Sequence, residues 1–212
     1  MNNVIRNIKN IDNALNFAFS FQYFAFTIRT AQVKYEINKL LEILNDLNPK
    51  IILEIGTAGG GTLFLFTRIA HPKATIISVD LPGGSFGGGY ASWKIPIYKS
   101  FTIDNQKMKL LRVDSHNLKT LEHVKNLIKD AKVDFLFIDG DHTYEGVKMD
   151  FEMYSGLVRE GGIIALHDIV EHTLESGCEV NKFWDEIKHN YKHQELIKDI
   201  KQTAAGIGLI FL

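Results

Sequence analysis

Five acidic residues occupy the same kind of position, beside the end of an apolar run. Glu54 lies just before a glycine-rich loop, and Asp80, Asp114, Asp139 and Asp168 each follow an apolar run. If these runs are parallel strands, their carboxyl ends meet at one crevice of the sheet, and the acids meet there as well. Carboxylates gathered in this way favour a ligand site, because they accept hydrogen bonds from hydroxyl groups and bind hard cations.

Residues 51–61 predict a strand, a tight turn and the start of a helix. Four of the six residues from Gly56 to Gly61 are glycine, which permits positive φ angles and lets a ligand approach the backbone closely. The free N–H groups of the next helix suit a nucleotide-like ligand. The spacing Gly56-x-Ala58-x-x-Gly61, with Asp80 19 residues further on, also satisfies a relaxed dinucleotide fingerprint. The loop alone therefore leaves NAD and S-adenosylmethionine as alternative ligands.

The acids after the second and third apolar runs are placed to hold an adenosine. Asp80 suits a ribose, because paired carboxylate oxygens match two vicinal hydroxyls, and Leu81 follows it. Asp114, assisted by Ser115, is expected near the adenine edge. The alternatives are a capping or turn role for Asp80 and a helix N-cap role for Asp114.

The acids after the next two runs form a second group with neighbouring histidines. Asp139 and Asp168, at adjacent strand ends, can share Mg²⁺ or another divalent cation, whereas a histidine ligand such as His167 would favour a transition metal. Such a cation would bind an acceptor hydroxyl and lower its pKa. His142 is a candidate general base. Helix capping by the acids, and simple hydrogen bonding by the histidine, are the alternative interpretations.

The elements that position these residues alternate between helices and strands. Apolar periodicity predicts helices over 31–47, 62–70, 118–128, 144–158 and 179–191, and strands over 51–55, 74–79, 109–113, 133–138, 163–166, 196–200 and 206–212. The last two strands would pair as a hairpin at the sheet edge, which makes the final strand antiparallel. We therefore predict an α/β, Rossmann-like sheet of seven strands in the order 3-2-1-4-5-7-6, with helices on both faces.

Two segments depart from this alternation. Residues 17–28 are apolar and rich in aromatic side chains, but they fall well short of the roughly 20 residues of a bilayer span and lack a convincing signal-peptide cleavage site. We expect an N-terminal segment, 1–48, that packs on the core of a catalytic domain, 49–212, or lids its site, or joins two subunits in a homo-oligomer. Residues 82–98 contain five glycines and two prolines, and we interpret them as an irregular loop, either a flap over the site or a loop packed on the surface. The aromatic residues of this loop are Phe86, Tyr90, Trp93 and Tyr98.

Composition bounds the class of protein. The length of 212 residues suits one α/β domain. The net charge is −1, from 24 basic and 25 acidic residues spread along the chain, so no basic stripe is available for a nucleic acid and none is expected as a partner. The single cysteine, Cys178, excludes an intramolecular disulfide and fits a cytoplasmic protein without a membrane partner.

Three stretches resemble one family. Residues 54–60 look like the first motif of class I S-adenosylmethionine-dependent methyltransferases. Residues 139–150 and 161–168 resemble the signature of the group that contains cephalosporin-hydroxylase-like and macrolide-sugar O-methyltransferase proteins. The resemblance covers residues 50–170 well. It implies methyl transfer from S-adenosylmethionine to an oxygen of a small molecule, such as a sugar or a secondary metabolite.

The resemblance also assigns roles to residues. Together with the positions argued above, it predicts a catalytic set of Asp139, His142 and Asp168, and a cofactor-binding set of Glu54, Gly56, Thr57, Ala58, Gly59, Gly60, Asp80, Leu81, Asp114, Ser115 and Asp139. In related metal-dependent enzymes, including catechol O-methyltransferase, the metal acids match Asp139 and Asp168. Those enzymes commonly add an Asn where this chain has Ile169, so His167, His142 or water would complete the shell. An NAD-linked oxidoreductase and a non-catalytic adenosyl-ligand-binding protein are the alternative functions.

Overall fold

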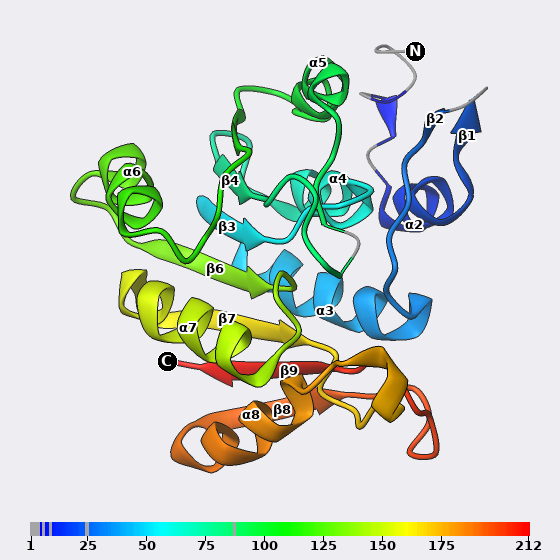
Figure 1. Ribbon diagram of the computed structural model, residues 1–212. Helices are drawn as coiled ribbons and strands as arrows, with labels where there is room; N and C mark the ends of the chain where they lie inside the picture. Colours follow the sequence, from blue (N-terminus) through cyan, green and yellow to red (C-terminus); the bar gives the residue numbers. More distant parts are fainter. Residues whose placement is uncertain (1–4, 6, 9, 24–25, 87) are drawn as a thin grey trace.

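One seven-stranded sheet organises the chain (Figure 1). The computed structural model describes residues 5, 7–8, 10–23, 26–86 and 88–212. The strands of the sheet are β3 (Ile51–Ile55), β4 (Thr75–Val79), β5 (Lys107–Leu111), β6 (Val133–Ile138), β7 (Val158–His167), β8 (Lys192–Leu196) and β9 (Ile207–Phe211). Their order is β5-β4-β3-β6-β7-β9-β8, and β9 is antiparallel to both of its neighbours, β7 and β8, whereas the other pairs are parallel. The predicted order and the antiparallel last strand are confirmed.

Helices cover both faces of the sheet, because successive strand residues point to opposite sides. Ile52 and Ile76 enter the apolar core of one face, whereas Leu53 and Ile77 enter that of the other. Helices on the first face are α2 (Ile11–Ser20), α3 (Lys34–Leu47), α4 (Gly61–Ile69) and α5 (Ile95–Lys99). Those on the second face are α6 (Leu118–Ile128), α7 (Tyr144–Tyr154) and α8 (Val180–Ile187). With both faces covered, the carboxyl ends of the parallel strands remain as the edge where a site can form.

The N-terminal segment packs against α4. The ring of Phe17 in α2 lies 4.8 Å from the ring of Phe64, measured between centroids. After α2, a hairpin of β1 (Gln22–Tyr23) and β2 (Phe26–Thr27) brings the chain back, and Arg29 then forms a parallel bridge with Gly60. Of the aromatic residues predicted in this segment, Phe24 lies outside the described residues, and Tyr23 and Phe26 are described by their backbone alone. The boundary at 48/49 and the subunit interface stay predictions.

Several boundaries differ from the sequence prediction, and the edge strand shows why. β8 is four residues earlier than the predicted 196–200, because its outward side chains are exposed and carry no apolar signal. β5 also begins two residues earlier than predicted. β7 begins at Val158 rather than at residue 163, since Gly161, at φ +69°, continues the strand through an irregularity in its pairing with β6. Exposed edges and bulges are poorly marked by hydrophobic pattern.

The segment 82–98 is only partly irregular, which corrects the sequence interpretation. Its second half forms a short 3₁₀ turn, η1 (Ser92–Lys94), followed by α5. Tyr98 is fully buried there, and its hydroxyl donates a 2.9 Å hydrogen bond to the carbonyl of Ala58. The second half of the segment therefore packs against the glycine-rich loop and helps to hold it in place.

Further 3₁₀ turns are η2 (Ser155–Leu157), η3 (Leu174–Ser176) and η4 (Lys188–Asn190). Within the described ranges, no helix is long and apolar enough to cross a membrane.

Candidate active site

The glycine-rich loop is fixed by close backbone contacts on both sides. Gly56 adopts φ +88°, its N–H donates a 2.9 Å hydrogen bond to the carbonyl of Val79, and a Cβ there would lie 1.9 Å from the carbonyl oxygen of Asp139. Gly60, at φ +75°, lies against the ring of Tyr98. Side chains at these two positions would push the loop away from its neighbours. The loop is therefore held in one shape at the ends of β3, β4 and β6.

Glu54 supports this loop from inside the protein. It is fully buried, and it accepts a 3.1 Å hydrogen bond from the hydroxyl of Thr57, which also contacts the hydroxyl of Ser78. Burial raises the pKa of Glu54 to about 8, against the lowering effect of hydrogen bonds from Thr62 and Thr57. Glu54 does not line the adjoining cavities, so its contact with the loop is through Thr57.

A cavity of about 330 Å³ opens between the glycine-rich loop and the ends of β4, β5 and β6. Asp80 lies in its wall and is 3% exposed. Its Oδ1 accepts hydrogen bonds from the N–H groups of Thr57, at 3.3 Å, and Gly89, at 3.2 Å. Its Oδ2 has no partner among the described residues, and burial raises the pKa of the carboxyl. One oxygen of Asp80 thus holds the neighbouring turns in place, and the other remains as a hydrogen-bond acceptor for a ligand.

The other end of this cavity is built from the turn after β5. Asp114 is exposed, and its Oδ1 accepts a 2.9 Å hydrogen bond from the N–H of His116. The N-cap of α6 is Asn117, so the alternative of an N-cap role for Asp114 is wrong. Asp114 and Ser115 line the cavity, as does Leu81, which is 46% exposed. The predicted cofactor-binding residues beyond the loop therefore surround one cavity.

His116 also lines this cavity, and no sequence prediction included it. Its Nε2 lies 3.3 Å from Oδ1 of Asp150, which is fully buried in α7, and 3.1 Å from the carbonyl oxygen of Gly146. The hydrogen bond with Asp150 raises the pKa of His116 to about 9. The pair ties the cavity wall to α7. A histidine and an aspartate 34 residues apart give no local signal in the sequence.

A second cavity, of about 360 Å³, lies on the other side of the glycine-rich loop. It is lined by residues 29–32 of the N-terminal segment, by 56–59, and by Thr62 and Asp139. Gln32 donates a 2.7 Å hydrogen bond from Nε2 to Oδ2 of Asp139. Gly56, Ala58 and Asp139 line both cavities, so the two spaces adjoin along these residues. The contribution of Gln32 was missed, since it comes from a separate segment with no recognisable motif.

The predicted catalytic and metal-binding residues form one cluster beside Asp139. His142 lies between the two carboxylates, with Nε2 at 3.3 Å from Asp139 Oδ1 and Nδ1 at 3.1 Å from Asp168 Oδ2. His167 Nδ1 lies 3.2 Å from each of the same oxygens. Ile169, at the position where the related enzymes add an Asn, packs into the apolar core instead. The structure therefore places all the predicted ligands together and leaves Ile169 out.

The charges of this cluster balance one another. Burial alone would raise the pKa of Asp139 and Asp168, but the histidines outweigh it and hold both values below the ordinary one. Burial alone would lower the pKa of His142, but Asp139, Cys178 and Asp168 raise it to about 10, and the carboxylates likewise raise the pKa of His167. Two buried carboxylates therefore hold two positive charges, here as imidazolium groups.

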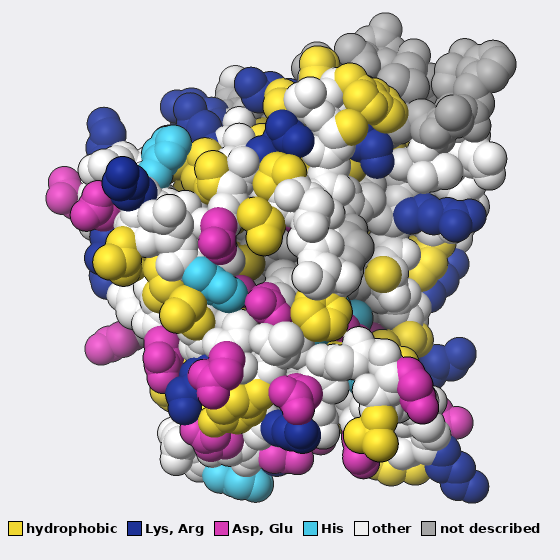
Figure 2. Space-filling view, viewed as in Figure 1, with side chains coloured by type: hydrophobic (Ala, Val, Ile, Leu, Met, Phe, Trp, Pro, Cys, Tyr) yellow, Lys and Arg dark blue, Asp and Glu magenta, His cyan; other side chains and the backbone are white. Residues whose placement is uncertain are grey.

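Neighbouring side chains enclose the cluster. The ring of Phe86 stacks on His142, with centroids 4.9 Å apart and planes 19° apart. His172 Nε2 lies 3.2 Å from Asp168 Oδ1. Asp141 instead accepts hydrogen bonds from the N–H and hydroxyl of Thr143, the N-cap of α7, which is a capping role. Figure 2 shows one face of the molecule, on which basic, acidic and hydrophobic side chains are interspersed.

Comparison with known proteins identifies the family. A curated relative, the uncharacterised protein y4gI of Sinorhizobium fredii, is 30% identical over 181 residues, which are 80% of this chain but 18% of that protein; the chain thus spans under a fifth of its length. An O-methyltransferase from Bacillus cereus, solved with S-adenosylhomocysteine, is 18% identical with a TM-score of 0.63 over 87% of this chain and 84% of that one.

A second solved structure, CalS11, is a TDP-rhamnose 3'-O-methyltransferase of calicheamicin biosynthesis, 15% identical with a TM-score of 0.59 over 85% of this chain and 80% of its own. At these identities the two structures show a shared fold. The family model described as "Methyltransferase domain" matches residues 53–169, which is more than half of the chain. The chain therefore belongs to the methyltransferase-domain family.

Proposed function

We propose that this protein transfers the methyl group of S-adenosylmethionine to an oxygen atom of a small molecule. The observation that carries the proposal is the buried Oδ2 of Asp80, which has no partner among the described residues, on a residue that lines a cavity beside the glycine-rich loop. A buried carboxylate oxygen without a partner is costly unless a ligand supplies the hydrogen bond. A ribose hydroxyl in this cavity would supply it.

The cavity residues fit the parts of this cofactor. Asp80 would bind the ribose, and Leu81, Asp114 and Ser115 would surround the adenine. The amino-acid end would extend along Gly56 to Gly60 into the second cavity, which residues 29–32 also line. The cofactor supplies a methyl group activated by a sulfonium charge. Asp139, at the junction of the two cavities, then lies beside the place where transfer occurs.

The cluster around Asp139 fits a divalent cation, which we include in the proposal. Asp139, Asp168 and His167 offer ligand atoms that all lie within 4.8 Å of one another. Both ring nitrogens of His167 lack a directed hydrogen bond within the described part of the chain, although the ring is 5% exposed. When bound, a cation supplies Lewis acidity that lowers the pKa of an acceptor hydroxyl. Mg²⁺ is the ion that the two carboxylates suit best.

His142 is the residue that we assign to the acceptor's proton. It lies against both carboxylates, and Phe86 stacks on its outer face and limits access of water. A base must be neutral before it takes a proton, and the pKa of about 10 keeps His142 protonated while the carboxylates have no other counter-charge. Its role as a base is therefore expected only when another cation balances Asp139 and Asp168.

The acceptor class rests on the resemblance to sugar and secondary-metabolite O-methyltransferases and on likeness to solved O-methyltransferases. The carboxylate and histidine cluster supports oxygen as the acceptor atom, because an amine would not need a metal. We also keep as proposals a cytoplasmic location and a homo-oligomer formed through the N-terminal segment. Neither a nucleic acid nor a membrane is proposed as a partner.

Calorimetric titration with S-adenosylhomocysteine, with and without Mg²⁺, tests the proposal. Micromolar binding is expected, and a heat that depends on Mg²⁺ would bring Asp139 and Asp168 into the mechanism. An NAD titration is the matched comparison: binding of NAD without S-adenosylhomocysteine binding would favour the oxidoreductase instead. A protein that binds the cofactor but transfers no methyl group to any of a panel of sugars and phenols would favour a non-catalytic binding role.

A further inference from the structure

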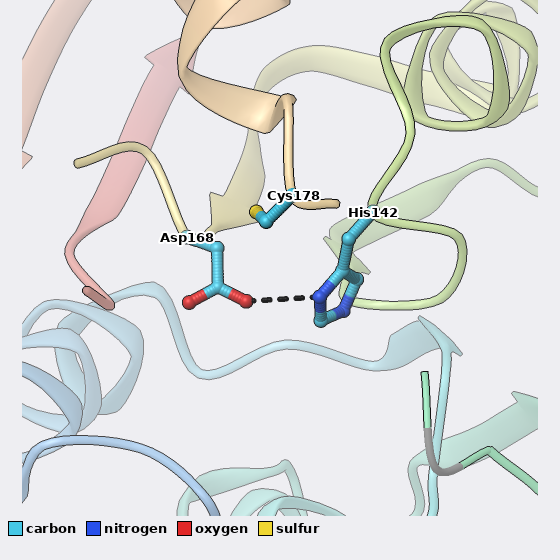
Figure 3. A group of neighbouring side chains, drawn as sticks. All are labelled: His142, Asp168 and Cys178. Carbon is cyan, nitrogen blue, oxygen red and sulfur yellow. Dashed lines mark ion pairs between the residues drawn. The ribbon is translucent and has the colours of Figure 1, made fainter. Parts of the chain in front are cut away.

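One thiol lies beside the carboxylate and histidine cluster. Cys178 and Asp168 both come from the connection between β7 and α8, and they lie beside His142, which comes from the loop after β6 (Figure 3). One ligand atom from each of the three side chains lies within 4.8 Å of the others, and the nitrogen and oxygen closest together, His142 Nδ1 and Asp168 Oδ2, are 3.1 Å apart. Nitrogen, oxygen and sulfur donors thus converge from two loops.

The spacing matches that of ligands on a single ion. Two ligands at roughly 2.0–2.1 Å from a tetrahedral ion lie about 3.4 Å apart, and a sulfur at about 2.3 Å lies slightly further from its neighbours. The 3.1 Å pair of His142 and Asp168 is already at this distance. Cys178, within 4.8 Å of both, needs only a small shift of its side chain. Three protein ligands would leave the fourth position for water.

The donor set selects the kind of ion. Mg²⁺ takes oxygen ligands and keeps several waters, whereas a thiolate and an imidazole are the preferred ligands of Zn²⁺ and similar ions. Oδ1 of Asp168 lies 3.2 Å from His172 Nε2, which itself accepts a hydrogen bond from the N–H of Ala205. Oδ2 of Asp168 is the oxygen that faces His142 Nδ1. This side of the cluster is therefore chemically different from the Asp139 side.

The surroundings also favour a dication. Asp139 and Asp168 carry two negative charges in a largely buried site. His167 is buried beside them, yet neither of its ring nitrogens makes a directed hydrogen bond within the described part of the chain. A divalent ion would balance both carboxylates by itself. The cluster has the charge and the enclosure of a metal site, as well as the ligands.

We propose that His142 Nδ1, Asp168 Oδ2 and Cys178 Sγ form a transition-metal site of the Zn²⁺ class, distinct from the Mg²⁺ position at Asp139. Because a bound ion occupies a lone pair of His142, filling this site withdraws His142 from proton transfer. The site is therefore inhibitory toward the proposed reaction. Metal binding itself does not depend on that reaction and is tested without a methyl donor.

Cobalt spectroscopy on the full chain tests the site, with Co²⁺ in place of Zn²⁺. The wild type is expected to develop a near-ultraviolet band for charge transfer from thiolate to Co²⁺, together with the visible bands of a tetrahedral ion. Cys178→Ser should lose the charge-transfer band while its circular dichroism spectrum stays that of the wild type. His193→Gln, which changes an exposed histidine elsewhere, is the control and should keep the band. A wild-type spectrum without the band would overturn the proposal.

Competition with a chromophoric chelator then measures the Zn²⁺ affinity. Cys178→Ser is expected to weaken Zn²⁺ binding by at least roughly tenfold, since even changes outside the ligand shell cost that much. Excess Mg²⁺ should not displace Zn²⁺ from the wild type. Equal Zn²⁺ affinity in the wild type, Cys178→Ser and His142→Gln would show that the ion binds elsewhere.

Discussion

The change of Asp80 to asparagine separates the two roles of this side chain. Asp80 Oδ1 accepts hydrogen bonds from the N–H groups of Thr57 and Gly89, and an amide oxygen can keep both. The amide nitrogen then replaces Oδ2, the buried oxygen without a partner, and presents a donor where a ribose hydroxyl needs an acceptor. The substitution thus removes the proposed ligand contact while preserving the loop.

The magnitude follows from one hydrogen bond to a charged group. Such a bond contributes about 1.5–3 kcal/mol, so the Kd for S-adenosylhomocysteine should rise roughly 10- to 150-fold in Asp80→Asn. Titration calorimetry measures the Kd, and thermal unfolding checks that the fold is unchanged. Asp130→Asn, at an exposed position outside the cavities, is the matched control. Wild-type affinity in a stably folded Asp80→Asn would refute the assignment of the ribose to this side chain.

Three further predictions concern the metal cluster, the cavity wall and the core. Asp168→Asn should abolish the Mg²⁺-dependent heat but leave S-adenosylhomocysteine binding unchanged; an ion effect that survives would place the cation elsewhere. His116, whose pKa is raised to about 9 from 6.5, contributes stability that is complete below about pH 6.5 and is lost as the pH rises through 9. The Tm advantage of the wild type over His116→Asn should therefore be largest near pH 6 and disappear by about pH 10, whereas a constant difference would contradict the ion pair. Phe66 is fully buried against the edges of Phe135 and Phe137, so Phe66→Ala should lower the free energy of unfolding by about 3–5 kcal/mol. Urea denaturation measures this loss, which should be smaller for Phe66→Leu.

The sequence predicted the site residues that local patterns mark. The positions of Asp80, Asp139 and Asp168 at one edge of the sheet were predicted because each follows an apolar strand, and strand ends of a parallel sheet share one edge. Gln32 and His116 could not be found in this way. Gln32 reaches Asp139 from a segment 107 residues away, and the pKa of His116, in the turn before α6, is raised by Asp150 on α7. Contacts of this kind depend on packing, which no single stretch encodes.

The same distinction holds for the fold. The central strand 133–138 and the helix 118–128 were predicted with their observed bounds, because burial on one or both sides imposes a clear apolar pattern. In β8, at the sheet edge, Leu196 is the one buried residue. The apolar pattern of the sequence therefore does not mark where this strand begins and ends. The sheet order was nevertheless predicted correctly, since it depends on the succession of elements more than on their bounds.

The backbone at Asp168 links the fold to the chemistry of the cluster. Asp168 has φ +63°, a left-handed conformation that a non-glycine residue adopts at a cost of order 1 kcal/mol or more. The next two residues hold it there, as Ile169 and Val170 donate hydrogen bonds to the carbonyls of Gly206 and Ala205. The carboxylate is thereby turned back toward His142 and His167 rather than along the strand. Ala205 and Gly206 lead directly into the antiparallel strand β9. This end of β9 thus helps to fix the carboxylate that both proposed metal positions share.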